Sequence, residues 1–378
     1  MSESPEPKRQ RLVLPDEHRS TADVAAAAAA TVASLPPSEN NSAVSITDDS
    51  PSFKNIEHAM HRIGDKEKSS KDEILEALGK LKTWARSEDK EEFSDKFIAL
   101  GGICRLLMFL NNPENINMNE KEYVVLVCDI LNPFNERDCM TYDSARKIAK
   151  QFVELDGVQI ILRVNQKYIV EGDIDELDAV KAIWIMLYGI FYFDDPSNAP
   201  TFDKEQVLAV VDAALDTIPL LKNANIENPT LRYLFRSLKY VMRSGKFDKN
   251  EVIERDTITK CLQALKSPDG NWDYEIYTWY TVIDFCGECE DKHNGILSND
   301  AHFKLFVSWC IESIKRYPDQ SPITFGLLGE ATDAADKTVA TETTDIVSEL
   351  GTIFIDDNLL QHVKDEASEF LKNLFNRE

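Results

Sequence analysis

The side chains with the clearest capacity for chemistry lie in one short stretch, CGECEDKH. In it Cys286 and Cys289 have the CxxC spacing, His293 follows four residues later, and His302 lies further on. A zinc site normally joins a CxxC pair to a second pair of Cys or His ligands. That second pair would here be two scattered histidines, so we interpret the stretch as a helix end with two thiols. A zinc ion bound by Cys286, Cys289 and His293 stays the alternative.

Two further patterns could suggest ion binding or catalysis. The stretch EGDIDELD carries Asp173, Asp175, Glu176 and Asp178, but it lacks the ligand spacing of a calcium loop and is typical of a charged helix start. The six histidines are scattered, and no GxSxG, HExxH or kinase motif occurs. We therefore expect no catalytic residue and no cofactor. The alternative is a helical enzyme or regulatory subunit whose site the sequence does not reveal.

A pair of adjacent glycines raises the question of phosphate binding. The pair lies in FIALGGICRLLMFL, residues 97–110, and it follows the helical spacing of Phe93 and Phe97. Phosphate loops need spaced glycines after a strand, and neither GxGxxG nor GxxxxGK[ST] occurs here. We predict instead that Gly101 ends one helix in a left-handed conformation and that Gly102 lets the next helix start close to the first.

Apolar residues follow helical spacing through most of the chain, and no convincing alternating strand pattern appears. One helix is predicted to begin after Ser70 as N-cap, with a buried face formed by Ile74, Leu75, Leu78, Leu81 and Ala85. Others are predicted at about residues 102–111, 120–132, 142–155, 157–166, 176–193, 203–222, 229–244, 248–266, 272–287, 300–316 and 357–375. The predicted fold class is therefore all-α.

These helices recur in a fixed order. The stretch FVELDGVQIILRV places Gly157 as a second joint, 55 residues after Gly102, and each glycine-joined pair is followed by a linker and another apolar helix. A looser third copy is VLAVVDAALDTIPLL followed by NPTLRYLFRSLKYVM. Repetition of helix, glycine, helix, linker and helix is typical of an α-solenoid.

Over about residues 93–245 this pattern resembles the armadillo repeat. The resemblance rests on a short helix, the glycine joint, a GI..LL..L helix and a following longer helix. It implies a right-handed α-solenoid, an armadillo-like superhelix whose third helices line a concave groove. In that family the groove binds an extended or helical segment of a partner protein.

The third helices depart from the family pattern in one respect. Many peptide-binding armadillo repeats carry a Trp and an Asn on this helix, and the Asn holds the partner's backbone. Asn132 falls at the Asn position, Gly189 and Tyr240 occupy it in the next two copies, and no Trp matches. The repeats of about 51 to 56 residues also exceed the usual length of about 42. The resemblance thus implies a divergent armadillo-like scaffold, with Asn132 and Tyr240 as partner-binding residues.

A second candidate binding patch lies further along the chain, in NWDYEIYTWYTVIDF. Trp272 and Tyr274 fall outside the helical spacing of its apolar residues, so they could form an exposed hot spot for a partner. The alternative is that these aromatic rings pack in the core.

Charge and hydropathy exclude several classes of partner. The net charge of −24 disfavours nucleic acid and anionic membrane surfaces, because both are bound through Lys and Arg. It is typical of a protein that meets a basic partner segment, or of one whose acidic surface simply keeps it soluble. The longest charge-free apolar run, AIWIMLYGIFYF, spans residues 182–193. A membrane helix needs about 20 apolar residues, so we predict a buried core helix here.

The ends of the predicted domain follow from composition. Residues 1–52 contain no aromatic residue, and we predict a disordered acidic, Pro- and Ala-rich tail. Residues 53–378 would form the armadillo-like domain, although the sequence leaves open whether residues 246–378 continue the superhelix. Lys8, Arg9 and Arg11 resemble a short nuclear localisation signal, and such clusters also occur by chance.

Together these patterns predict a non-enzymatic interaction scaffold. The scattered cysteines are typical of small buried side chains in a reducing compartment, among them Cys104, Cys128, Cys261 and Cys310. We therefore expect a cytoplasmic or nuclear protein, or one present in both compartments.

Overall fold

The computed structural model of the chain describes residues 51–64, 69–87, 89–112, 121–132, 142–171, 177–192, 202–223, 229–243, 300–334 and 344–375. These residues form fourteen α-helices and one short 3-10 helix, η3, with no strand among them. The all-α prediction is confirmed for this part of the chain. The predicted helices at 248–266 and 272–287 lie outside it, as do residues 1–50.

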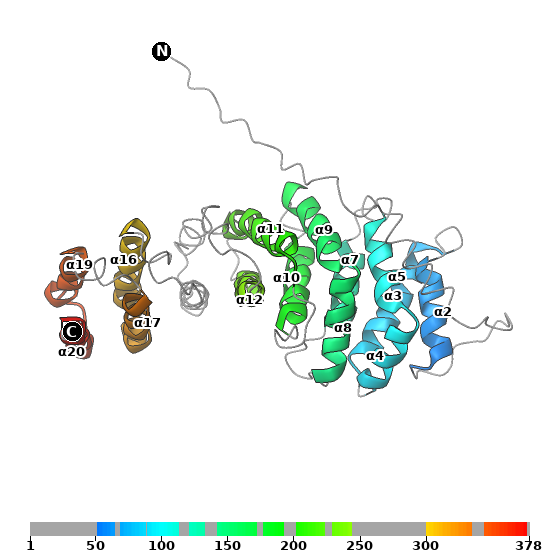
Figure 1. Cartoon of the computed structure of the whole chain (residues 1–378), viewed down its shortest axis with the longest axis horizontal. Coiled ribbons are helices and arrows are strands. Elements are labelled where there is room, and N and C mark those ends of the chain that lie inside the picture. The colour runs from blue at the N-terminus through cyan, green and yellow to red at the C-terminus, as the bar shows by residue number, and fades with distance from the viewer. Residues whose placement is uncertain are drawn as a thin grey trace, which may run out of the picture.

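Ten of the described helices lie before residue 244, and Figure 1 shows them following one another in chain order. They are α2 (Phe53–Gly64), α3 (Lys71–Ala85), α4 (Lys90–Ala99), α5 (Gly102–Asn111), α7 (Lys121–Leu131), α8 (Tyr142–Glu154), α9 (Gly157–Glu171), α10 (Leu177–Tyr192), α11 (Lys204–Asn223) and α12 (Pro229–Arg243).

Local sequence explains the start of α3. The Ser70 side chain accepts a hydrogen bond from the backbone N–H of Glu73, and the Glu73 carboxylate accepts one from the backbone N–H of Ser70. This reciprocal pair is a capping box, which satisfies two backbone donors that a helix start leaves without partners. The predicted cap is confirmed. The predicted buried face is confirmed except at Leu75, whose side chain is only half-buried.

The first glycine pair is a helix joint, as predicted. Gly101 takes the left-handed conformation, with φ of 67°, between α4 and α5. A Cβ atom on Gly102 would lie 2.3 Å from the ring of Phe97, which leaves no room for a side chain. Gly101 therefore provides the left-handed turn, and Gly102 lets the two short helices meet closely because it lacks a Cβ atom.

The second joint uses different residues for the same two tasks. The left-handed position between α8 and α9 is filled by Asp156, with φ of 56°, and not by a glycine. Gly157 is the close-contact residue, since a Cβ atom there would lie 2.7 Å from the backbone oxygen of Phe152. Asp tolerates the left-handed region better than most side chains, although it still carries strain there.

Helices in equivalent positions contact one another along the chain. One set, which we call the groove layer, consists of α3, α7, α10 and α12, each packed on the next. A second set, the back layer, consists of α2, α5, α9 and α11, again in sequential contact. The short helices α4 and α8 also pack together. Equivalent helices of successive copies are thus neighbours in space.

Hydrogen bonds between copies show the spacing of the repeat. Lys147 donates to Asp95 across α8 and α4 at 2.8 Å, and Arg163 donates to Asn111 across α9 and α5 at 2.9 Å. Both pairs are separated by 52 residues. A third bond with this separation runs between Asn165 on α9 and Thr217 on α11. The spacing falls within the range predicted from sequence.

The remaining described helices, coloured yellow to red in Figure 1, form a second group. They are α16 (Asp300–Arg316), η3 (Pro318–Gln320), α17 (Ser321–Ala334), α19 (Thr344–Ile355) and α20 (Gln361–Phe375). The α16 helix packs on α17 and α19, and α20 packs on both of those. Residues 329–334 belong to the end of α17, and residues 344 and 345 start α19.

The start of α20 corrects one prediction. The sequence predicted this helix from about residue 357, but α20 begins only at Gln361. The Asp356 carboxylate accepts a hydrogen bond from the backbone N–H of Asn358 in the preceding turn. Leu360 precedes the helix and is exposed.

Candidate functional site: a groove across three helices

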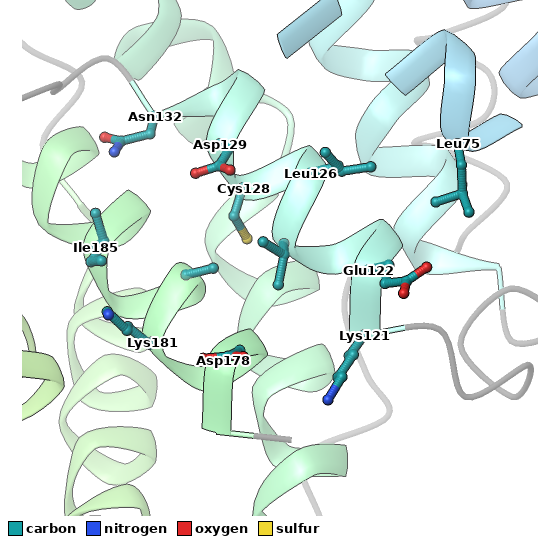
Figure 2. A pocket seen from close by; sticks show the side chains of 12 residues that line it. Leu75, Lys121, Glu122, Leu126, Cys128, Asp129, Asn132, Asp178, Lys181 and Ile185 are labelled. Atoms are coloured by element: carbon teal, nitrogen blue, oxygen red, sulfur yellow. The ribbon is translucent and has the colours of Figure 1, made fainter. Parts of the chain in front are cut away.

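A solvent-open groove of about 590 Å³ crosses α3, α7 and α10 in the groove layer (Figure 2). Helical spacing explains its lining, because residues three or four apart lie on one face of a helix. On α7 that face includes Lys121, Val125, Cys128 and Asn132. The complete lining consists of Leu75, Lys121, Glu122, Val125, Leu126, Cys128, Asp129, Asn132, Asp178, Lys181, Ala182 and Ile185.

The floor of the groove is apolar. Leu75, Val125, Leu126, Ala182 and Ile185 are all partly buried and pack against the hydrophobic core beneath them. Each still presents surface to solvent, and covering that surface would stabilise a complex by about 25 cal/mol per Å² of apolar area before the costs of association.

The rim of the groove is charged. At one end Figure 2 shows Lys121 and Asp178, in the first turns of α7 and α10. At the other end lie Asp129 and Asn132. Asp178 therefore begins a helix, as the acidic stretch around it predicted.

The Asp129 carboxylate forms ion pairs with two cations, Lys82 on α3 and Arg86 at the C-terminal end of α3. Lys82 Nζ lies 2.6 Å from one carboxylate oxygen, and Arg86 Nη2 lies 2.7 Å from the other. Both contacts cross from α3 to α7, so they fix how these two helices align at the edge of the groove. Exposed ion pairs of this kind stabilise a fold only weakly.

Cys128, the one cysteine in the groove lining, has a thiol of low reactivity. Cys128 is fully buried beneath the floor, and burial raises the pKa of its thiol well above the usual value. The nearby Asp129 carboxylate raises that pKa further. Because the thiolate is the nucleophile and metal ligand, this thiol is unsuited to either task at neutral pH. Burial likewise raises the pKa of Cys104, and both cysteines were predicted to be buried.

The predicted partner-binding residues fall in two places. Asn132 lies in the groove lining at the end of α7. Tyr240 lies on α12, outside this lining, where its ring centroid is 5.3 Å from that of Tyr192 and 5.9 Å from that of Tyr188. Tyr188 and Tyr192 follow Ile185 on α10 at spacings of three and seven residues, so this tyrosine cluster continues the same helix face.

The remaining candidate residues belong to parts of the chain that the structure does not describe. Trp272, Tyr274, Cys286, Cys289 and His293 lie outside the described residues. The same holds for Lys8, Arg9 and Arg11 at the start of the chain. Among the residues that the structure does describe, no three His, Cys, Asp or Glu side chains gather closely enough to hold a metal ion. No helix in this part is both long and apolar enough to cross a membrane.

Sequence reasoning missed the residues that form the floor. Leu75, Val125 and Ile185 look like ordinary core residues, because each belongs to a broad apolar helix face. The run at residues 182–193 was predicted to be a buried helix, and most of α10 is indeed buried. The residues of α10 that stay half-buried, such as Ala182 and Ile185, could have been identified only from the packing of the neighbouring helices.

Comparisons with known proteins do not add a family to this geometry. No protein-family model matches the chain, and no curated protein matches it. The resemblance to armadillo repeats therefore rests on the glycine joints, the order of helices and the contacts described above.

Proposed function

We propose that the chain is a non-enzymatic scaffold that binds an extended segment of a protein partner in the groove over α3, α7 and α10. The observation that carries this proposal is the open groove itself, with an apolar floor and a charged rim. It lies on the layer formed by the third helices, where the armadillo resemblance predicts partner binding, and Asn132 is part of it.

The proposal includes an armadillo-like, right-handed α-solenoid as the architecture of this region. Support comes from the sequential contacts within the groove layer and within the back layer. Further support comes from the 52-residue separation of bonds between neighbouring copies. Stacking of equivalent helices on their nearest neighbours is the defining feature of solenoid proteins.

The shape of the groove favours a polymer over a small molecule. Small-molecule sites enclose most of their ligand, whereas this groove is open along three helices. Its lining also contains no histidine and only one thiol, which is buried. An enzyme would need convergent nucleophiles and bases, so the described part of the groove favours binding.

A variant pair can test this proposal. Val125→Glu with Ile185→Glu places two charges on the floor. Met108→Glu with Ile323→Glu adds the same charge at positions that are 46% and 40% exposed outside the groove. We expect a stoichiometric partner to co-purify with the tagged wild-type chain and with the control, and to be lost from the groove variant. Equal recovery from all three proteins would contradict the proposal.

Nuclear import would require a signal such as Lys8, Arg9 and Arg11, and we propose that this cluster provides it. The test is a tagged chain lacking residues 1–12, compared by fluorescence microscopy with a chain in which only these three residues are alanine. Loss of nuclear fluorescence in both is expected. Unchanged nuclear fluorescence would contradict the signal without bearing on the groove.

A further inference from the structure

The helix α19 exposes apolar side chains at one end of the long axis of the molecule (Figure 1). Val347, Phe354 and Ile355 are 42%, 38% and 79% exposed, whereas Leu350 and Ile353 are fully buried where α19 packs in its own group. A surface helix normally turns polar residues outward, and a helix that is apolar on all sides is normally buried on all sides. One face of α19 is therefore apolar and uncovered.

Gly351 lies at the centre of this exposed face. Val347 precedes it by four residues and Ile355 follows it by four, so the three residues form one stripe along the helix. A Cβ atom on Gly351 would meet no atom within 4 Å, so packing within the chain does not require a glycine here. Glycine weakens a helix relative to alanine, but it allows the backbone of another element to approach closely.

The stripe through Gly351 carries no charge. The only charged residues of α19 are Asp345 and Glu349, six and two residues before Gly351, which is off the face that spacings of three and four define. The whole chain has a net charge of −24, so acidic surfaces of two copies repel one another. An uncharged face is one that a second copy can cover without bringing like charges together.

We propose that this face of α19 binds the same face of a second copy of the chain. In an antiparallel pair with a two-fold axis at Gly351, this glycine faces its counterpart and Val347 faces Ile355 of the other copy. An apolar residue four positions to either side of a glycine gives the self-complementary pattern that a two-fold contact needs. Asp356 and Asp357 would then lie beside the N-terminal end of the other α19, where the helix dipole favours carboxylates. The inference does not rest on the groove over α3, α7 and α10.

Sedimentation velocity of the full-length chain tests the inference over about 1–100 μM, a range that detects weak association. Val347→Glu with Ile355→Glu places charges on the face. Met108→Glu with Ile323→Glu is the matched control at exposed positions on α5 and α17. Circular dichroism confirms that each variant is folded. We expect dimers of the wild-type and control chains and monomers of the face variant. A monomeric wild-type chain, or equal dimerisation of all three, would overturn the inference.

Gly351→Ala separates association from folding. The position has open space within one copy, so the variant should fold and melt at the same or a higher temperature as a monomer. Two methyl groups would meet at the two-fold axis, and the dimer should weaken on the order of tenfold. Unchanged or tighter dimerisation would overturn the axis at Gly351.

Salt gives a second readout of the same contact. Raising sodium chloride from about 0.05 to 0.5 M screens the repulsion between the two acidic copies. Because the contact itself is apolar and uncharged, the dimer should become tighter as salt rises. Dissociation of the dimer at high salt would show that ion pairs hold it, and would overturn a contact through the face of α19.

Discussion

The link between α9 and α11 in the back layer differs in kind from the link between α3 and α7 in the groove layer. In the back layer Asn165 and Thr217 are fully buried, and the Asn165 amide donates to the Thr217 hydroxyl oxygen at 3.1 Å. In the groove layer the corresponding link between α3 and α7 is the partly exposed pairing of Asp129 with Lys82 and Arg86.

We expect the buried hydrogen bond to contribute to stability and the partly exposed ion pairs to be open to binding. A buried hydrogen bond fixes register because any other alignment leaves a polar group without a partner in an apolar environment. A partly exposed ion pair contributes little to stability and stays accessible to a ligand. Changes in the back layer should therefore alter folding, and changes around the groove should alter binding.

The largest difference in stability is expected between alanine substitutions at two glycines. Gly157 starts α9 in the back layer against the Phe152 backbone, and Gly79 lies within α3 with open space around it. Gly157→Ala should lower the free energy of unfolding by about 1–3 kcal/mol through overpacking. Gly79→Ala should raise it by about 0.5–1 kcal/mol, because alanine favours the helix. Urea denaturation measures both, and a neutral Gly157→Ala chain would contradict the close joint.

The buried hydrogen bond should behave as a coupled pair. Thr217→Val alone leaves the Asn165 amide without this acceptor, and we expect a loss of about 1–3 kcal/mol in the free energy of unfolding. Asn165→Leu combined with Thr217→Val removes both polar groups and should cost less than the sum of the single changes. Additive losses in this double-mutant cycle would mean that the bond does not set the alignment of α9 and α11.

A substitution at Asp129, in the groove layer, should alter binding more than stability. Asp129→Asn removes the carboxylate between Lys82 and Arg86, at an expected cost below about 1 kcal/mol in the free energy of unfolding. Because Asp129 lines the groove, the recovery of the co-purified partner should change although the chain stays folded. Unchanged recovery of the partner by a folded Asp129→Asn chain would argue against a binding role for this edge of the groove.

The smallest effect is a pH dependence that arises in the back layer. On α2, partial burial lowers the pKa of His58 below its ordinary value of 6.5, and Arg62 and His61 lower it further. The unfolded chain therefore takes up a proton at higher pH than the folded chain, so stability falls as the pH drops below about 7 towards the folded pKa. His58→Gln should reduce this loss in thermal melts at pH 7 and pH 5. An identical loss of stability between pH 7 and pH 5 in the variant would show that His58 does not cause it.

Much of this fold could be predicted from local sequence, and the groove could not. The 3.6-residue spacing predicted α5, α7 and α10 to within a residue or so, because a helix buries one face. Gly101 and Gly102 predicted a joint because their roles depend on nearby residues. The left-handed Asp156 was not predicted, since Asp gives a weaker signal than Gly for that conformation.

The floor of the groove depends on contacts that the local sequence does not show. Leu75 belongs to the apolar face of α3, and only the position of α7 decides that it stays half-buried. Val125 and Ile185 line the same groove from two helices, although they are 60 residues apart in sequence. Asn132 was predicted because a family resemblance supplied the spatial arrangement that periodicity lacks.

Hydrogen–deuterium exchange of the full-length chain, with and without the co-purified partner, tests the central claim most directly. The account predicts slower exchange in α7 and α10 when the partner is bound, with α5 and α9 unchanged. Protection confined to the back layer, or to the helices of residues 300–375, would contradict a binding groove over α3, α7 and α10.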